Sequence, residues 1–314
     1  MGEQLDLFGN KPAKPAEPAP VVQEEEAPVA ATPESLPGQM DLFGDRWQRA
    51  AAAHKALQSF DLEGAADGLR EAVKSYPTDT SLIERVELVT KLAKTLRGAR
   101  RKAKSPARAL AAIEPKVPEF LAEYWHRRLA ELMEDEGGAG AVLDGVPAGL
   151  HWLRAGDPAR AEESLRATLE REPLDCRARG YLADALFVQE RQPEARKEYR
   201  QALSLSPEQV DIRHAADIAV RDLPSVAEED FELPGEPVEW AVAVGLIAGL
   251  FLPPSHLPDD WVEPAALEKL PAGVQFYRWL VAEKVARDDA QRIACRRAMK
   301  ALSPRLIKEV VGSR

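Results

Sequence analysis

Apolar positions divide the chain near residue 46. From Trp47 onward they recur at three- and four-residue spacing, the period of amphipathic helices, and no run alternates as a half-buried strand would. Residues 10–38 consist largely of Pro, Ala and Glu and contain no aromatic residue, so they offer little apolar area to offset the entropy of ordering. We therefore expect an all-α protein with a disordered N-terminal tail over residues 1–45.

Part of the helical region repeats itself. Residues 142–175 align with residues 176–209 at an offset of 34, and small or bulky residues recur at matching places. The matching pairs are Gly149 with Ala183, Trp152 with Leu186, Ala161 with Ala195, Leu165 with Tyr199, Leu169 with Leu203, and Pro173 with Pro207. The small residues would let paired helices approach closely, while the large ones fill the seam between them.

This pattern resembles the tetratricopeptide repeat, including its Gly-Asp turn between helices, here Gly156-Asp157, and its closing proline. A third copy fits residues 46–79, and a further unit begins at Val210 before it decays at Leu223-Pro224. The resemblance implies a tetratricopeptide-like α-solenoid over 46–222, which would present a groove to a partner protein. Groove-lining positions of the first helices map to Arg154, Arg177, Tyr181 and Asp184. The family's familiar carboxylate-binding pattern is missing, because Gly180 and Val188 hold two of its places.

Other helices are expected outside the repeats. Residues 81–136 favour two or three helices, one of which restarts at Ser105-Pro106, with serine as cap and proline in the first turn. Residues 223–237 are typical of an acidic linker. The region 238–314 then predicts three helices, which form a separate bundle or degenerate repeats: Val238–Leu252, Gln275–Arg287 and Asp289–Leu302. The first of these is 15 residues long, whereas a spanning helix needs about 20, so we expect a buried helix and no membrane role.

Two apolar islands interrupt the polar tail. They are Gln4-Leu5-Asp6-Leu7-Phe8-Gly9 and Gln39-Met40-Asp41-Leu42-Phe43-Gly44, which differ only by leucine for methionine. The leucine and phenylalanine side chains could bury together in a cleft, each contributing roughly 1.5–3 kcal/mol of gross burial. Such a peptide would bind in the micromolar range once the cost of ordering it is subtracted.

Both islands resemble the clamp-binding motif of bacterial replication and repair proteins, whose common form is Gln-Leu-(Ser/Asp)-Leu-Phe. In that family the motif docks into a hydrophobic cleft on each subunit of the ring-shaped DNA polymerase sliding clamp. The resemblance implies the following docking residues: Gln4, Leu5, Leu7, Phe8, Gln39, Met40, Leu42 and Phe43. Two alternatives stay open, since the islands could bind another partner, such as an adaptor that recognises Asp-Leu-Phe tripeptides, or fold back onto the body.

Charge changes this picture in one place. The net charge is −10, which argues against a protein that coats nucleic acid, and eight acidic residues against two lysines fall within residues 1–44. Residues 91–108, in contrast, are basic and contain no acid. On a continuous helix Lys94, Arg97, Arg101 and Lys104 would share one face and could contact phosphate. A solvated face paired with acids such as Glu131, Glu134 and Asp135 is the favoured alternative, so DNA binding is not expected from this stretch alone.

Candidate chemistry is sparse. The chain has no phosphate-binding Gly-Lys-Ser/Thr loop, no paired-histidine metal helix and no nucleophile elbow, and its five histidines are scattered in sequence. His126 and His151 lie beside Trp125 and Trp152 and are interpreted as packed or surface residues. Cys176 and Cys295, the two cysteines, are typical of a reduced, cytoplasmic compartment. We expect a non-enzymatic adaptor without cofactor or metal.

Overall fold

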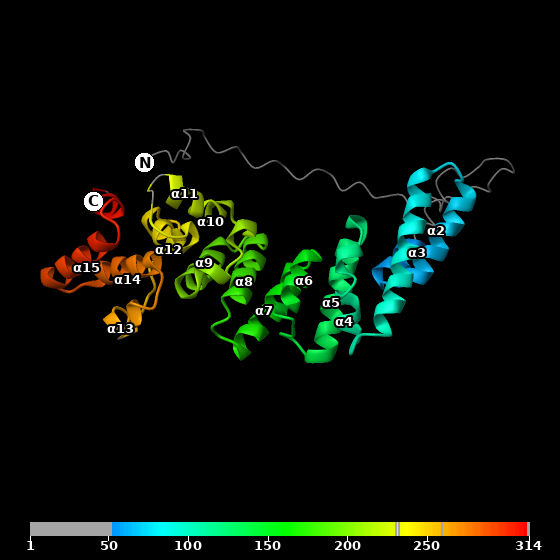
Figure 1. Cartoon of the computed structure of the whole chain (residues 1–314), viewed down its shortest axis with the longest axis horizontal. Coiled ribbons are helices and arrows are strands. Elements are labelled where there is room, and N and C mark those ends of the chain that lie inside the picture. Colours follow the sequence, from blue (N-terminus) through cyan, green and yellow to red (C-terminus); the bar gives the residue numbers. More distant parts are fainter. Residues whose placement is uncertain (1–51, 230, 232, 259, 313–314) are drawn as a thin grey trace, which may run out of the picture. The chain divides into compact units, whose positions relative to one another are not determined.

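The computed structural model describes residues 52–229, 231, 233–258 and 260–312. Within them the chain is mostly helical, and most helices pack against the next along the sequence (Figure 1). This confirms the all-α, tetratricopeptide-like class. The tail and both of its apolar islands lie outside the described residues.

The N-terminal helices form one packed group. They are residues 52–58, α2 (Leu62–Ser75), α3 (Thr80–Arg100), α4 (Pro106–Ala111) and α5 (Ala122–Gly137). Short polar side chains begin three of them: Asp61 caps α2, Asp79 caps α3 and Ser105 caps α4, each by accepting a backbone N–H of the first turn. Two 3-10 turns, η1 (Glu114–Lys116) and η2 (Glu119–Leu121), connect α4 to α5. The predicted restart at Ser105-Pro106 is confirmed.

The end of α3 corrects the expected basic helix face. The helix stops at Arg100, Arg101 is its C-cap residue, and Lys104 lies in the bend before α4. Ser105 and Pro106 start a new helix here, so the chain changes direction before Lys104. Only Lys94 and Arg97 of the four basic residues therefore lie on α3 itself.

The repeat region consists of two helical hairpins, α6 (Ala148–Arg154) with α7 (Pro158–Arg171), and α8 (Cys176–Val188) with α9 (Gln192–Leu205). Positions 34 residues apart occupy equivalent buried places, as Ala161 and Ala195 or Leu165 and Tyr199 illustrate. A Cβ on Gly149 would lie 2.3 Å from Leu165 Cγ, which explains how closely α6 and α7 approach. The 34-residue register predicted from the sequence is thereby confirmed.

A small hairpin precedes the first repeat. Strands β1 (Val142–Leu143) and β2 (Val146–Pro147) pair antiparallel, and Asp144 and Gly145 form the turn with positive φ. Two residues per strand are too few to produce the alternating pattern by which strands are predicted. The first aligned unit, 142–175, therefore begins with this hairpin, and its first helix starts only at Ala148.

The further unit expected from Val210 does not form a helical hairpin. The chain instead makes two 3-10 turns, η3 (Pro207–Gln209) and η4 (Ile212–His214), and the short helices α10 (Ile218–Arg221) and α11 (Leu223–Glu229). Helix α11 occupies half of the interval expected to be a linker, because Leu223 and Ala227 bury one face against α12. Val210 and Ile212 are buried here as well, although not in a repeat.

The C-terminal helices share one hydrophobic core with α9 and α11. They are α12 (Pro237–Ile247), α13 (Pro264–Leu267), α14 (Ala272–Val285), α15 (Asp289–Leu302) and α16 (Leu306–Gly312). Helix α12 is buried without interruption from Trp240 to Leu246, and α9, α11 and α14 pack against it. Gly273 permits the closest approach, since a Cβ there would lie 2.2 Å from the Glu239 carbonyl oxygen. The buried helix predicted over Val238–Leu252 is present but ends at Ile247, and Leu252 is exposed. The two other helices predicted for this region form, whereas α13 and α16 were not predicted. Among the described helices, none is long and apolar enough to cross a membrane.

Candidate protein-interaction surface

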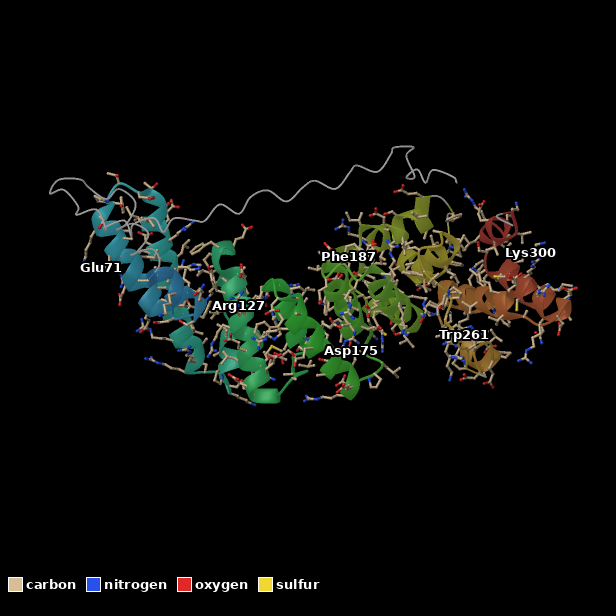
Figure 2. The ribbon with its side chains drawn as sticks, turned by 180° about the vertical axis from the view of Figure 1, so that it is seen from behind. Glu71, Arg127, Asp175, Phe187, Trp261 and Lys300 are labelled. Carbon is tan, nitrogen blue, oxygen red and sulfur yellow. The ribbon has the colours of Figure 1, made fainter. Side chains whose placement is uncertain are left out.

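The four predicted groove residues meet around Tyr181. Arg154 ends α6, while Arg177, Tyr181 and Asp184 follow one another on α8, whose two ends are marked by Asp175 and Phe187 in Figure 2. Burial raises the pKa of the Tyr181 phenol, Asp211 and Asp184 raise it further, and Arg177 and Arg154 oppose them. Arg154, Arg177 and Asp184 therefore all lie close enough to Tyr181 to influence its pKa. The candidate surface around Tyr181 consists of these four residues.

Asp184 is already engaged within the fold. Its Oδ1 accepts a hydrogen bond from the Tyr199 hydroxyl and one from the Ala216 backbone N–H at 2.7 Å. Burial raises the pKa of Asp184 to about 6, and these two donors work against that rise. The carboxylate thus ties the second repeat to the turns that follow it.

The two arginines are the more available groups of this surface. Both are exposed, and Arg177 Nη1 donates to the Gly145 carbonyl oxygen at 3.3 Å, which joins α8 to the β1–β2 turn. Such a backbone contact leaves the other guanidinium N–H groups of Arg177 for a partner, because the fork carries five donors. The contribution of Arg154, Arg177, Tyr181 and Asp184 to partner binding stays a prediction.

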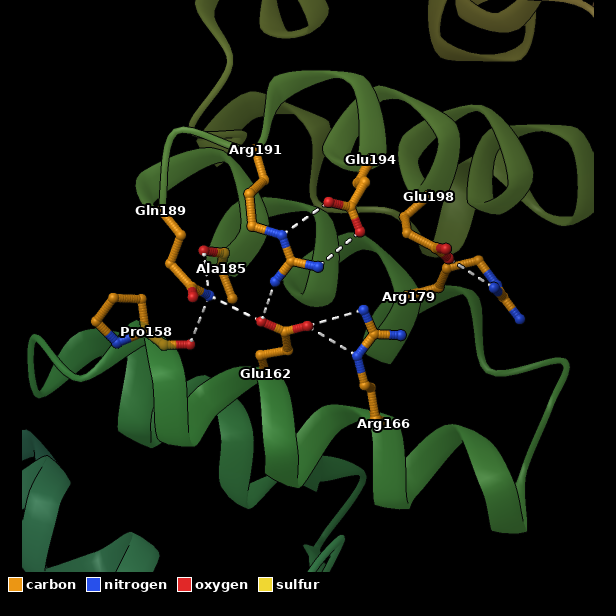
Figure 3. Close-up of polar contacts among 9 residues, drawn as sticks. All are labelled: Pro158, Glu162, Arg166, Arg179, Ala185, Gln189, Arg191, Glu194 and Glu198. Atoms are coloured by element: carbon orange, nitrogen blue, oxygen red, sulfur yellow. Dashed lines mark hydrogen bonds and ion pairs between the residues drawn. The ribbon is translucent and has the colours of Figure 1, made fainter.

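A polar seam centred on Glu162 joins the two repeats (Figure 3). Glu162 of α7 accepts hydrogen bonds from Arg166 on its own helix, from Gln189 after α8 and from Arg191 at the start of α9, the last at 2.6 Å. Burial raises the pKa of Glu162, but these three donors outweigh it and hold the pKa below its ordinary value. The sequence shows only the Glu162–Arg166 spacing of four; the contacts with residues 27 and 29 positions away were missed.

Two histidines that are distant in sequence lie in contact between α5 and α6. The Nδ1 atoms of His126 and His151 are 2.9 Å apart, and both rings pack edge-on to Trp125. Burial lowers the pKa of His126 to about 4 and that of His151 to about 3, and the positive charge of Arg154 contributes to both shifts. Of the two interpretations, packed or surface residues, the structure shows the packed one; the pairing of the two rings was not predicted. In the part of the chain that is described, no group of three or more metal-ligating side chains converges.

The four basic residues suggested as phosphate contacts are all exposed. Arg97 forms an ion pair with Glu63 of α2 at 3.3 Å, and neither side chain is buried. Two of the three acids proposed as alternative partners pair elsewhere, since Glu131 contacts Arg128 and Glu134 contacts Arg160. Lys94, Arg101 and Lys104 have no ion pair among the described residues. Whether this stretch contacts phosphate stays a prediction.

The eight docking residues of the two tail islands fall outside the described residues. No curated protein and no solved structure matches the chain significantly. A family model does match part of it: residues 148–210, from α6 to just beyond α9, match the model described as tetratricopeptide repeat. The repeat region at the centre of this chain is therefore tetratricopeptide-like, a type of fold that serves as a protein-interaction scaffold.

Proposed function

We propose that this protein is a non-enzymatic adaptor that attaches a helical-repeat scaffold to the bacterial DNA sliding clamp. The tail would dock on the ring through its two islands, and the repeat surface would hold a second replication or repair protein. The observation that carries the proposal is the near-identity of the two islands, each with Gln, an apolar residue, Asp, Leu and Phe in the same order. The tetratricopeptide match of residues 148–210 supports the scaffold part.

The spacing of the islands favours simultaneous docking. From Phe8 to Gln39 the chain has 31 steps, and a Pro-rich segment at about 3.1 Å per residue could reach on the order of 95 Å. The clamp, as the resemblance implies, carries two identical clefts on one ring. Occupying both would raise affinity through effective concentration without any new contact.

The test is fluorescence anisotropy of labelled peptides 1–12, 36–47 and 1–47 titrated with the purified bacterial clamp. We expect binding in the micromolar range for each short peptide and binding at least about tenfold tighter for the long one. The matched controls are Phe8→Ala and Phe43→Ala, singly and together. Loss of each short-peptide interaction with its alanine change supports docking through the islands, whereas an absence of binding by all three peptides removes the clamp from the proposal.

A scaffold unrelated to DNA is the second candidate, and the acidic balance of the chain favours it if the peptides fail. In that case the islands serve another partner, while the surface around Tyr181 retains its role. Clamp binding by the full chain separates the two candidates, because only the first predicts it. Arg154→Glu with Arg177→Glu should abolish capture of the body's partner in either case, and should leave clamp binding by the full chain unchanged.

A further inference from the structure

A cavity of about 450 Å³ lies between the last repeat helix and the segment that follows α12. One wall is formed by α9 and the other by residues 249–255, and neither wall belongs to the surface around Tyr181. Leu250, Leu252 and Pro253 supply apolar lining from the second wall. Leu252 is 77% exposed, which leaves its side chain available to a partner.

The first wall is positively charged. Arg196, Lys197 and Arg200 all line the cavity from α9, and among its described lining residues there is no acid. Arg196 is partly neutralised, because its Nε donates to the buried Asp217 carboxylate at 2.8 Å. Lys197 is exposed and makes no ion pair with any described residue.

Arg200 is the informative member of this wall. It is only 7% exposed, yet its one hydrogen bond among the described residues goes from Nη1 to the Tyr277 hydroxyl, at 3.1 Å, which is not a charged partner. A carboxylate is the ligand that the planar guanidinium fork fits best. Arg200 lines an open cavity that has no acid among its described lining residues, which indicates that an anionic group can complete the site.

We propose that this cavity binds an acidic peptide segment of a partner protein. A carboxylate of the segment would pair with Arg200 and Lys197, and an adjacent large apolar side chain would cover Leu252 and Pro253. A peptide is favoured over single-stranded nucleic acid because no aromatic residue lines the cavity for base stacking. The inference deepens the scaffold half of the proposed function and does not depend on clamp binding.

The test uses the full chain and four labelled eight-residue peptides, each with acidic residues flanking a central Leu, Ile, Phe or Trp. Anisotropy should give a Kd on the order of 10–100 μM for at least one of them at low salt. Two control peptides are made from the one that binds: in the first, amides replace the acids, and in the second, serine replaces the apolar residue. Each should bind at least about tenfold more weakly. A labelled oligothymidine reports any binding of nucleic acid.

The decisive variants change exposed residues, so that folding is retained. Lys197→Glu and Leu252→Ser should each weaken binding of the acidic apolar peptide at least about fivefold. The matched controls, Lys300→Glu and Leu174→Ser, also change exposed residues and should bind as the parent does. Arg200→Lys, with its circular dichroism melt compared with the parent, tests the guanidinium fork.

Four results overturn the proposal. Two concern the peptides: no acidic peptide binds up to about 300 μM, or the amide version binds as tightly as the acidic one. Two concern the variants: the control variants lose as much binding as Lys197→Glu and Leu252→Ser, or oligothymidine binds, the peptides do not, and Lys197→Glu removes that binding. Failure of the tail peptides on the clamp is a separate result, since the clamp is absent from this experiment.

Discussion

The repeat region and the C-terminal helices bury their apolar residues in opposite ways. In α7 the buried residues Ala161, Ser164, Leu165 and Thr168 follow the helical period and cover one face. In α12 burial runs unbroken from Trp240 to Leu246 and covers every face. The repeats therefore share thin cores with polar seams such as that of Glu162 between them, while the C-terminal region gathers several helices around one apolar helix. This difference predicts where the molecule tolerates change.

The largest effect is expected at the centre of the C-terminal core. Trp240→Ala removes a side chain that is fully buried and whose Nε1 donates to the Pro234 carbonyl oxygen at 2.8 Å. It should lower the free energy of unfolding by about 3–5 kcal/mol, because the cavity left behind cannot collapse among so many packed neighbours. Urea unfolding followed by circular dichroism measures the loss.

The control for that change is Ile293→Ala on α15, where the side chain is half exposed and a shift within about 0.5 kcal/mol is expected. A loss below about 1 kcal/mol for Trp240→Ala would mean that α12 is not the organising element of its core.

A smaller effect should follow in the repeats from Gly149→Ala. The added Cβ would lie 2.3 Å from Leu165 Cγ and 3.0 Å from the Ala161 carbonyl oxygen, so α6 and α7 must separate, at a cost of about 1–3 kcal/mol. Gly98→Ala is the matched control, because a Cβ on this exposed glycine of α3 meets nothing within 4 Å. That change should stabilise the protein by about 0.5–1 kcal/mol. Destabilisation by both changes would contradict the close-approach argument; thermal melts decide it.

A dependence on pH is expected at the junction of α5 and α6. The pKa values of His126 and His151 are lowered to about 4 and about 3 by burial, so below the ordinary value of about 6.5 the unfolded chain binds protons that the folded chain does not. The free energy of unfolding should therefore decrease as the pH falls from about 6.5 toward 4. His126→Gln with His151→Gln should flatten this decrease in melting temperature.

Asp184 works in the opposite direction over part of the same range. Burial raises its pKa to about 6, so between about pH 4 and 6 the folded chain binds the extra proton, and this group gains stability as the pH falls. Asp184→Asn removes that gain and should make the acid-induced decrease steeper. An unchanged pH profile in both variants would show that neither site controls it.

The parts of the fold that were predictable are those where packing leaves a period in the sequence. The offset of 34 placed the repeat hairpins, the Asp288-capped helix Asp289–Leu302 has its predicted bounds, and Ser105-Pro106 located the start of α4. Each of these depends on local spacing or capping, which a single sequence contains. The short turns from Pro207 to His214 were not predicted, because Val210 and Ile212 keep apolar positions even though the chain no longer forms a hairpin.

The polar contacts were less predictable than the helices. Glu162 meets Arg191, and His126 meets His151, only after neighbouring helices dock, so neither pairing leaves a local signal. The groove positions came from a family resemblance, which placed Arg154, Arg177 and Tyr181 near one another but did not reveal that Asp184 is tied to Ala216. Arg200 gave no sign of its burial, because it lies in a helix rich in charged residues and its partner Tyr277 is 77 positions away.

The uninterrupted burial of α12 has a consequence for synthesis of the chain. Helix α12 is complete at Ile247, but α14, which covers one of its sides, does not begin until Ala272. At roughly 5–20 residues per second, the ribosome leaves the apolar helix without this cover for on the order of one to five seconds. During that interval the nascent chain exposes its most apolar helix beside an already folded repeat. A pause in translation, or a stop before Ala272, would therefore favour aggregation and recognition by chaperones over completion of the fold.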